Sequence, residues 1–92
     1  MTSLDENQLK LLEEYASLLF TIDEIAGLLK TDAAALRRDI RHGKNLVAET
    51  YFKGKMETMI AVRRNIIQFA KKGSPQAETF VKDYLEQQNN NE

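Results

Sequence analysis

Apolar residues recur at helical spacing almost from end to end of this chain, and no stretch alternates apolar and polar residues as a strand does. The 92 residues include a single proline, Pro75, so the backbone rarely opposes helix formation. A chain of this length supports one modest hydrophobic core. We therefore predict an all-α protein with five helices.

Signals for helix ends divide the chain. Ser3 with Glu6, and Thr21 with Glu24, have the spacing of a capping box, in which two side chains satisfy free amides at a helix start. The Gly-Ser-Pro sequence at 73–75 is typical of one helix stopping and another starting. The predicted helices span about residues 4–19, 22–29, 33–41, 46–72 and 75–87.

The long fourth helix is apolar over so wide an arc that it must be covered on more than one side. Gly54 either interrupts this helix or allows another backbone to pack closely against it. The short connection at 73–75 favours antiparallel packing of the fifth helix on the fourth. We expect three parts: a helical unit at 1–44, a helical hairpin at 45–88 that mediates oligomerisation, and a disordered polar tail at 89–92.

The composition excludes several classes of site. The chain has no cysteine and a single histidine, His42, so disulfides, thiolate metal sites and multi-histidine metal centres are ruled out. Neighbouring carboxylates such as Glu13 and Glu14 diverge around a helix and do not converge on a catalytic centre. We expect no metal, no cofactor and no enzymatic activity. No apolar run approaches membrane-spanning length and no signal peptide is recognisable, which predicts a soluble cytoplasmic protein.

A net charge of -1 hides a strong segregation of charge along the chain. Residues 1–29 carry -5, residues 30–72 carry +7 and residues 73–92 carry -3. A basic middle between acidic ends suggests a local anionic partner. The same charge would also suit a solvated basic helix face, so charge alone leaves both interpretations open.

The segment at 22–40 has the pattern of a helix-turn-helix. Ala26 provides the small residue needed where the two helices cross, and Asp32 is the expected N-cap of the second helix. Leu36 and Ile40 are predicted to point to the core, which turns the opposite stripe outward. That stripe is slim at its start and carries arginines further along, as a helix entering the major groove requires. The candidate DNA contacts are Lys30, Thr31, Ala34, Arg37, Arg38, Arg41 and Lys44.

Two parts of the chain resemble a known family. Residues 21–42 resemble helix-turn-helix domains of the sigma-factor and terminase-small-subunit type, with Lys30 where such motifs usually have glycine. Residues 51–57, 70–75 and 77–80 are similar to the helical hairpin that follows this domain in phage terminase small subunits. The resemblance implies recognition of double-stranded viral DNA for packaging, assembly into a homo-oligomer, delivery of DNA to a large terminase subunit, and a place in the cytoplasm of a bacterial host.

Two other functions fit the same residues. A small transcriptional regulator would use the same helix-turn-helix on an operator site. A protein-interaction module would use the same shape to bind a helix of another protein. The surface of the third helix separates these hypotheses, because arginines paired with Asp39, Glu49 or acidic residues of the first helix would not be free to contact DNA.

Overall fold

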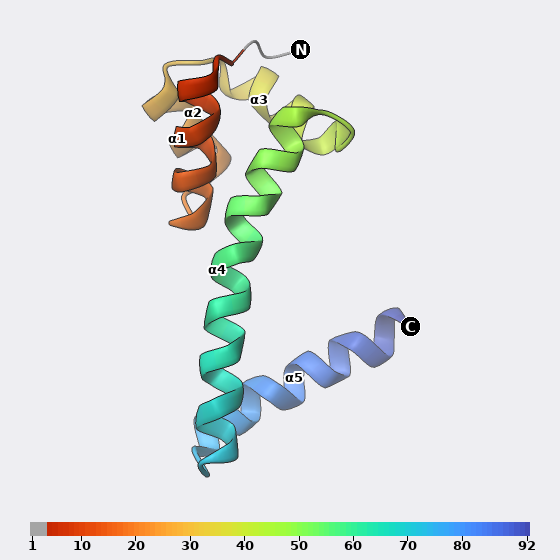
Figure 1. Ribbon diagram of the computed structural model, residues 1–92. Helices are drawn as coiled ribbons and strands as arrows, with labels where there is room; N and C mark the ends of the chain where they lie inside the picture. Colours follow the sequence, from red (N-terminus) through yellow and green to blue (C-terminus); the bar gives the residue numbers. More distant parts are fainter. Residues whose placement is uncertain (1–3) are drawn as a thin grey trace. The chain divides into compact units, whose positions relative to one another are not determined.

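The computed structural model describes residues 4–92, which contain five helices and no strand (Figure 1). The all-α fold predicted from the sequence is confirmed. The helices are α1 (Glu6–Ser17), α2 (Ile22–Leu29), α3 (Ala33–His42), α4 (Leu46–Lys71) and α5 (Pro75–Asn91). None of the helices at 4–92 is both long enough and apolar enough to cross a membrane.

The first helix is shorter than predicted at both ends. Its N-cap is Asp5, whose carboxylate accepts from the Gln8 amide at 2.8 Å while the Gln8 side chain accepts from the Asp5 amide at 3.0 Å. The Ser3–Glu6 box was therefore the wrong start, and Ser3 itself lies outside the described residues. The helix ends at Ser17 because Leu19 adopts a left-handed conformation with φ of 63°, which helical backbone cannot include.

The next two helices begin where the capping residues predicted. The Thr21 hydroxyl accepts from the Glu24 amide at 3.2 Å, and the Glu24 carboxylate accepts from the Thr21 amide at 2.9 Å. Asp32 accepts from the Ala35 amide at 3.1 Å and so caps α3. Gly43 ends α3 with φ of 78°, a conformation that glycine adopts without steric cost.

A single side chain joins α3 to α4. The Asn45 amide nitrogen donates to the Asp39 carbonyl at 2.8 Å, and the Asn45 amide oxygen accepts from the backbone of Ala48 at 2.8 Å. The first bond satisfies a carbonyl in the last turn of α3, and the second satisfies an amide in the first turn of α4. The corner between the two helices is thus fixed by hydrogen bonds on both sides.

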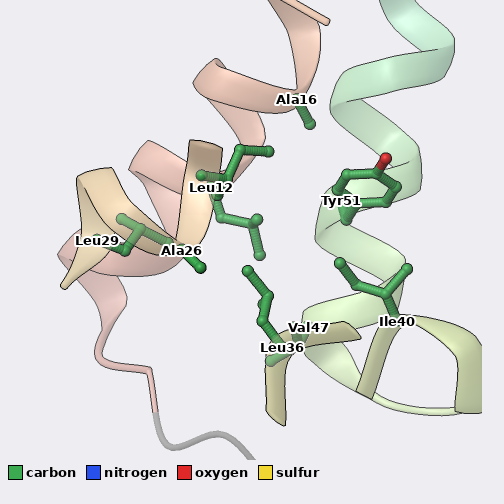
Figure 2. Packing of buried hydrophobic residues seen from close by; sticks show 9 residues of the cluster. Leu12, Ala16, Ala26, Leu29, Leu36, Ile40, Val47 and Tyr51 are labelled. Atoms are coloured by element: carbon green, nitrogen blue, oxygen red, sulfur yellow. The ribbon is translucent and has the colours of Figure 1, made fainter. Parts of the chain in front are cut away.

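Contacts divide the chain into a first unit that ends at Thr58 and a second unit, Met59–Glu92. The boundary lies inside α4 and not near residue 44 as predicted. The reason is visible in Figure 2, where α4 contributes Val47 and Tyr51 to the core of the first unit. The buried core residues are Leu12 and Ala16 of α1, Ile25, Ala26 and Leu29 of α2, Leu36 and Ile40 of α3, and Val47 and Tyr51 of α4. Leu28 of α2 is half exposed and lies outside this cluster.

Gly54 allows α1 and α4 to approach each other closely. It is buried in an unbroken helix, and a Cβ atom built on it would lie 2.1 Å from the Glu13 carbonyl oxygen. Of the two roles considered for this glycine, close packing is the one it has. Beside it, the Lys53 ammonium lies 3.1 Å from the Glu13 carboxylate, and the hydrogen bond to that carboxylate raises the pKa of Lys53. The Thr58 hydroxyl donates to the Ser17 carbonyl at the end of α1.

The second unit has little core. Within it, α5 turns back from the end of α4 at an oblique angle (Figure 1), and the Arg63 guanidinium lies 4.3 Å from the centre of the Tyr84 ring. Ala77 is the buried apolar residue of this unit among the described residues. Helix α5 continues to Asn91, where we had expected disorder from residue 89, so the polar end of the chain is helical.

Candidate nucleic-acid interface

The turn between α2 and α3 is tight and uses a lysine where glycine would fit more easily. Lys30 adopts left-handed backbone angles, φ 56° and ψ 44°, and the Thr31 amide donates to the Ala26 carbonyl at 3.0 Å. This bond pattern satisfies the free carbonyls at the end of α2. It leaves the Lys30 side chain exposed and the Thr31 side chain half-buried.

Helix α3 has one buried face and one exposed face, as its sequence predicted. Leu36 is fully buried and Ile40 is only 4% exposed, so both anchor the helix in the core. Ala34, Arg38 and Arg41 lie on the opposite side and are exposed. We call these three residues the outer ridge of α3. Because they are spaced four and three residues apart, they follow one stripe of the helix.

Arg37 was predicted to belong to this free stripe, and here the structure differs. Its guanidinium forms an ion pair and hydrogen bond with the carboxylate of Asp23 in the first turn of α2. The Arg37 side chain is 35% exposed and that of Asp23 is 68% exposed. This pair ties α2 to α3 at the surface and holds Arg37 in a defined position. Asp23 is not among the acidic residues that we expected to compete for these arginines.

A hollow of about 290 Å³ opens beside the outer ridge, and sequence reasoning missed it. It is lined by Ala35, Arg38, Asp39 and His42. These residues come from successive turns of α3, so their spacing of three and four was the available signal. Asp39 is nearly buried, whereas Arg38 and His42 are exposed at the rim. The hollow therefore presents two basic side chains around a buried carboxylate.

The remaining predicted contact, Lys44, is exposed just beyond the glycine that ends α3. Lys30 and Lys44 therefore flank the two ends of α3 in the chain, and the outer ridge lies between them. This arrangement places cations at both ends of a helix whose exposed stripe is slim at its start. Such a surface can contact phosphates at its margins and base edges at its centre.

Within residues 4–92, no three histidine or acidic side chains gather in a way that could hold a metal ion. Comparisons with protein families, with curated proteins and with solved structures find no match for this chain. The interpretation of the surface therefore depends on its own geometry.

Proposed function

We propose that this chain is a non-enzymatic protein that binds double-stranded DNA, with α2, the turn at 30–32 and α3 acting as a helix-turn-helix. In this proposal α3 is the recognition helix and enters the major groove. The observation that carries the proposal is the division of α3, with Leu36 and Ile40 buried behind it while Arg38 and Arg41 are exposed in front. Small side chains at the start of α3 give the helix a narrow leading end.

The individual residues take different roles in this proposal. Arg38 and Arg41 supply forked donors for guanine edges or phosphates. Lys30 and Lys44 hold backbone phosphates, and the exposed Ala34 permits close approach to the bases. Arg37 lies at the edge of the interface, where its ion pair with Asp23 competes with DNA for its guanidinium.

The biological setting that we propose is recognition of phage DNA for packaging, in the manner of a small terminase subunit. It is supported by the resemblance of residues 21–42 and of the later hairpin to that family. The proposal includes self-association and delivery of DNA to a large terminase subunit in a bacterial cell. A transcriptional regulator would use the same surface. A pull-down with purified large terminase subunit separates the two roles.

The test of DNA binding removes Arg38 and Arg41 together. We expect Arg38→Ala with Arg41→Ala to lower affinity for duplex DNA at least tenfold, because two of the exposed cations on α3 are lost. If both contact phosphates, the slope of log affinity against log salt falls by about 2, since each phosphate contact contributes roughly 0.9. Fluorescence anisotropy across a salt series measures both quantities.

A matched control removes two exposed lysines of other helices, one in α1 and one in α5. Lys10→Ala with Lys82→Ala changes the net charge by the same amount and should leave affinity within about twofold. Equal losses for the two double variants would show a diffuse charge effect and contradict a specific role for α3. Circular dichroism confirms that both variants keep their helices.

A further inference from the structure

The second unit leaves large apolar side chains uncovered on both of its helices. Along Met59–Glu92 only Ala77 is a buried apolar residue, although this range is rich in aliphatic and aromatic residues. So small a core cannot offset the conformational entropy lost when two helices become ordered. The exposed set comprises Ile60, Val62, Ile67, Phe69, Phe80 and Leu85, each between 40% and 58% exposed.

Helix α5 contacts this part of α4 at Arg63, whose guanidinium stacks on the ring of Tyr84. Ile60 and Ile67 are seven residues apart and lie on one side of Arg63 around the helix axis. Val62 and Phe69 have the same spacing and lie on the other side of Arg63. Apolar side chains on both sides of Arg63 are therefore exposed.

The two helices of this unit carry opposite charges. The part of α4 in the second unit has three basic residues, Arg63, Arg64 and Lys71, and no acidic residue, and Lys72 follows directly after the helix. Helix α5 has Glu78, Asp83 and Glu86 against a single lysine, Lys82. Two such units placed with unlike helices side by side would join opposite charges, whereas like helices side by side would repel.

We propose that the occupant of this surface is a second copy of the chain, with α4 of each copy packed beside α5 of the other in a four-helix arrangement. A twofold dimer requires a surface that is complementary to itself, and an apolar face flanked by one basic and one acidic helix meets that requirement. The inference gives the self-association proposed above a defined interface. It does not depend on DNA binding.

Mass in solution without DNA tests the pairing. We expect the 92-residue chain to sediment as two chains of 10.5 kDa each at micromolar concentration. Ile67→Asp with Phe80→Asp should reduce it to one chain, because aspartate cannot be buried in an apolar interface without cost. The matched control, Leu18→Asp with Leu28→Asp, changes two leucines of the first unit that are 60% and 50% exposed, and it should leave the two-chain mass unchanged.

The arrangement of helices is tested by reversing charge on both of them in one chain. A variant with Arg64→Glu, Lys71→Glu, Lys72→Glu, Glu78→Lys and Asp83→Lys carries a net charge of -2 over 59–72 and +2 over α5. It should pair with itself, since unlike helices still meet with opposite charges. It should not pair with the unmodified chain, because basic would then face basic and acidic would face acidic. Native mass spectrometry of the mixture distinguishes mixed from unmixed pairs.

Three outcomes would overturn the proposal. The first is a single-chain mass for the unmodified protein across 5–200 µM. The second is a two-chain mass for the variant with aspartate at 67 and 80. The third is the formation of mixed pairs in the charge-reversal experiment. Failure to bind DNA would not contradict the proposed dimer. Conversely, a single-chain protein that still binds DNA through α3 would contradict the dimer and not the proposed DNA binding.

Discussion

At the scale of single residues, Lys30 is the position where local conformation and proposed function make opposite demands. Its left-handed backbone suits glycine, yet its exposed ammonium adds a cation beside the proposed recognition helix. Helix-turn-helix motifs usually have glycine in this turn, and the left-handed conformation of Lys30 is the one that glycine would adopt. Lysine has a higher conformational energy in this left-handed backbone than glycine would have, but it keeps a positive charge in the turn.

Lys30→Gly should stabilise the first unit and weaken DNA binding. Left-handed backbone costs a non-glycine residue about 1–2 kcal/mol, and the greater freedom of glycine in the unfolded chain offsets part of the gain. We expect a net gain of about 0.5–1 kcal/mol, measured by urea denaturation. Lys30→Ala is the control, because it removes the same charge but keeps the strain. A less stable glycine variant would contradict the assigned conformation.

Asp23 is the second residue whose role the structure defines. Asp23→Asn should raise affinity for duplex DNA, because it releases Arg37 and removes a negative charge near the proposed interface. Stability should fall by less than about 1 kcal/mol, since the pair is exposed and a carboxylate in the first helical turn is only modestly favourable. Anisotropy titration measures the affinity.

Glu14→Gln is the matched control for that experiment, because Glu14 is exposed on α1 and carries the same charge. It should change DNA affinity much less than Asp23→Asn does. If Asp23→Asn instead weakens binding, the carboxylate serves to aim Arg37 at DNA and does not compete with DNA for it. That result would reverse the sign of the role assigned here.

The faces of α3 could be predicted from residue spacing, but the Arg37 pairing could not. Spacing of three and four residues correctly separated Leu36 and Ile40 from Arg38 and Arg41. Whether an arginine is paired depends on which side chain a different helix brings near it. Asp23 is 14 positions away from Arg37 along the chain, so helical periodicity carries no information about their contact.

At the scale of helices, the close approach of α1 and α4 depends on Gly54. Caps and hydrophobic periodicity predicted all five helices, with errors of a few residues at some ends. They could not decide whether Gly54 breaks a helix or admits a neighbour, because both roles suit a glycine. The structure shows that Gly54 admits a neighbour, because the Glu13 carbonyl oxygen occupies the space that a Cβ atom would need.

Gly54→Ala should destabilise the first unit by about 1–3 kcal/mol or more, because backbone atoms of α1 must move to admit the methyl group. Gly27→Ala is the control within α2. Nothing lies within 4 Å of the Cβ position at Gly27, so this change should stabilise by roughly 0.5–1 kcal/mol through helix propensity. Thermal unfolding followed by circular dichroism compares the two. Similar effects for both alanines would refute the close contact.

At the scale of the whole molecule, the core is concentrated in the first unit. Nine buried residues of α1 to α4 form one cluster there, whereas Ala77 is the buried apolar residue of the second unit. The sequence predicted two helical units and a polar tail, and it placed the boundary between the two helical units at the loop before α4. The actual boundary falls within a continuous helix, where neither composition nor a breaking residue marks it.

This imbalance predicts two levels of protection from hydrogen exchange. Backbone amides of α1 to α3 should exchange slowly at every protein concentration, because their opening requires loss of the common core. Amides of 59–91 should be protected at high concentration and exchange much faster on dilution, as partner binding stabilises the folded form by mass action. Mass spectrometry of peptides from 5 and 200 µM samples measures this. Equal protection at both concentrations would contradict it.

The corner at Asn45 has a consequence for variation at that position. Only a side chain with both a donor and an acceptor at this reach can serve the Asp39 carbonyl and the Ala48 amide together. Aspartate would lose the donor, and lysine would lose the acceptor. A neutral replacement such as alanine would loosen the link between α3 and α4 and leave every charged group in place, so any loss of DNA affinity would come from misalignment of α3 and not from charge.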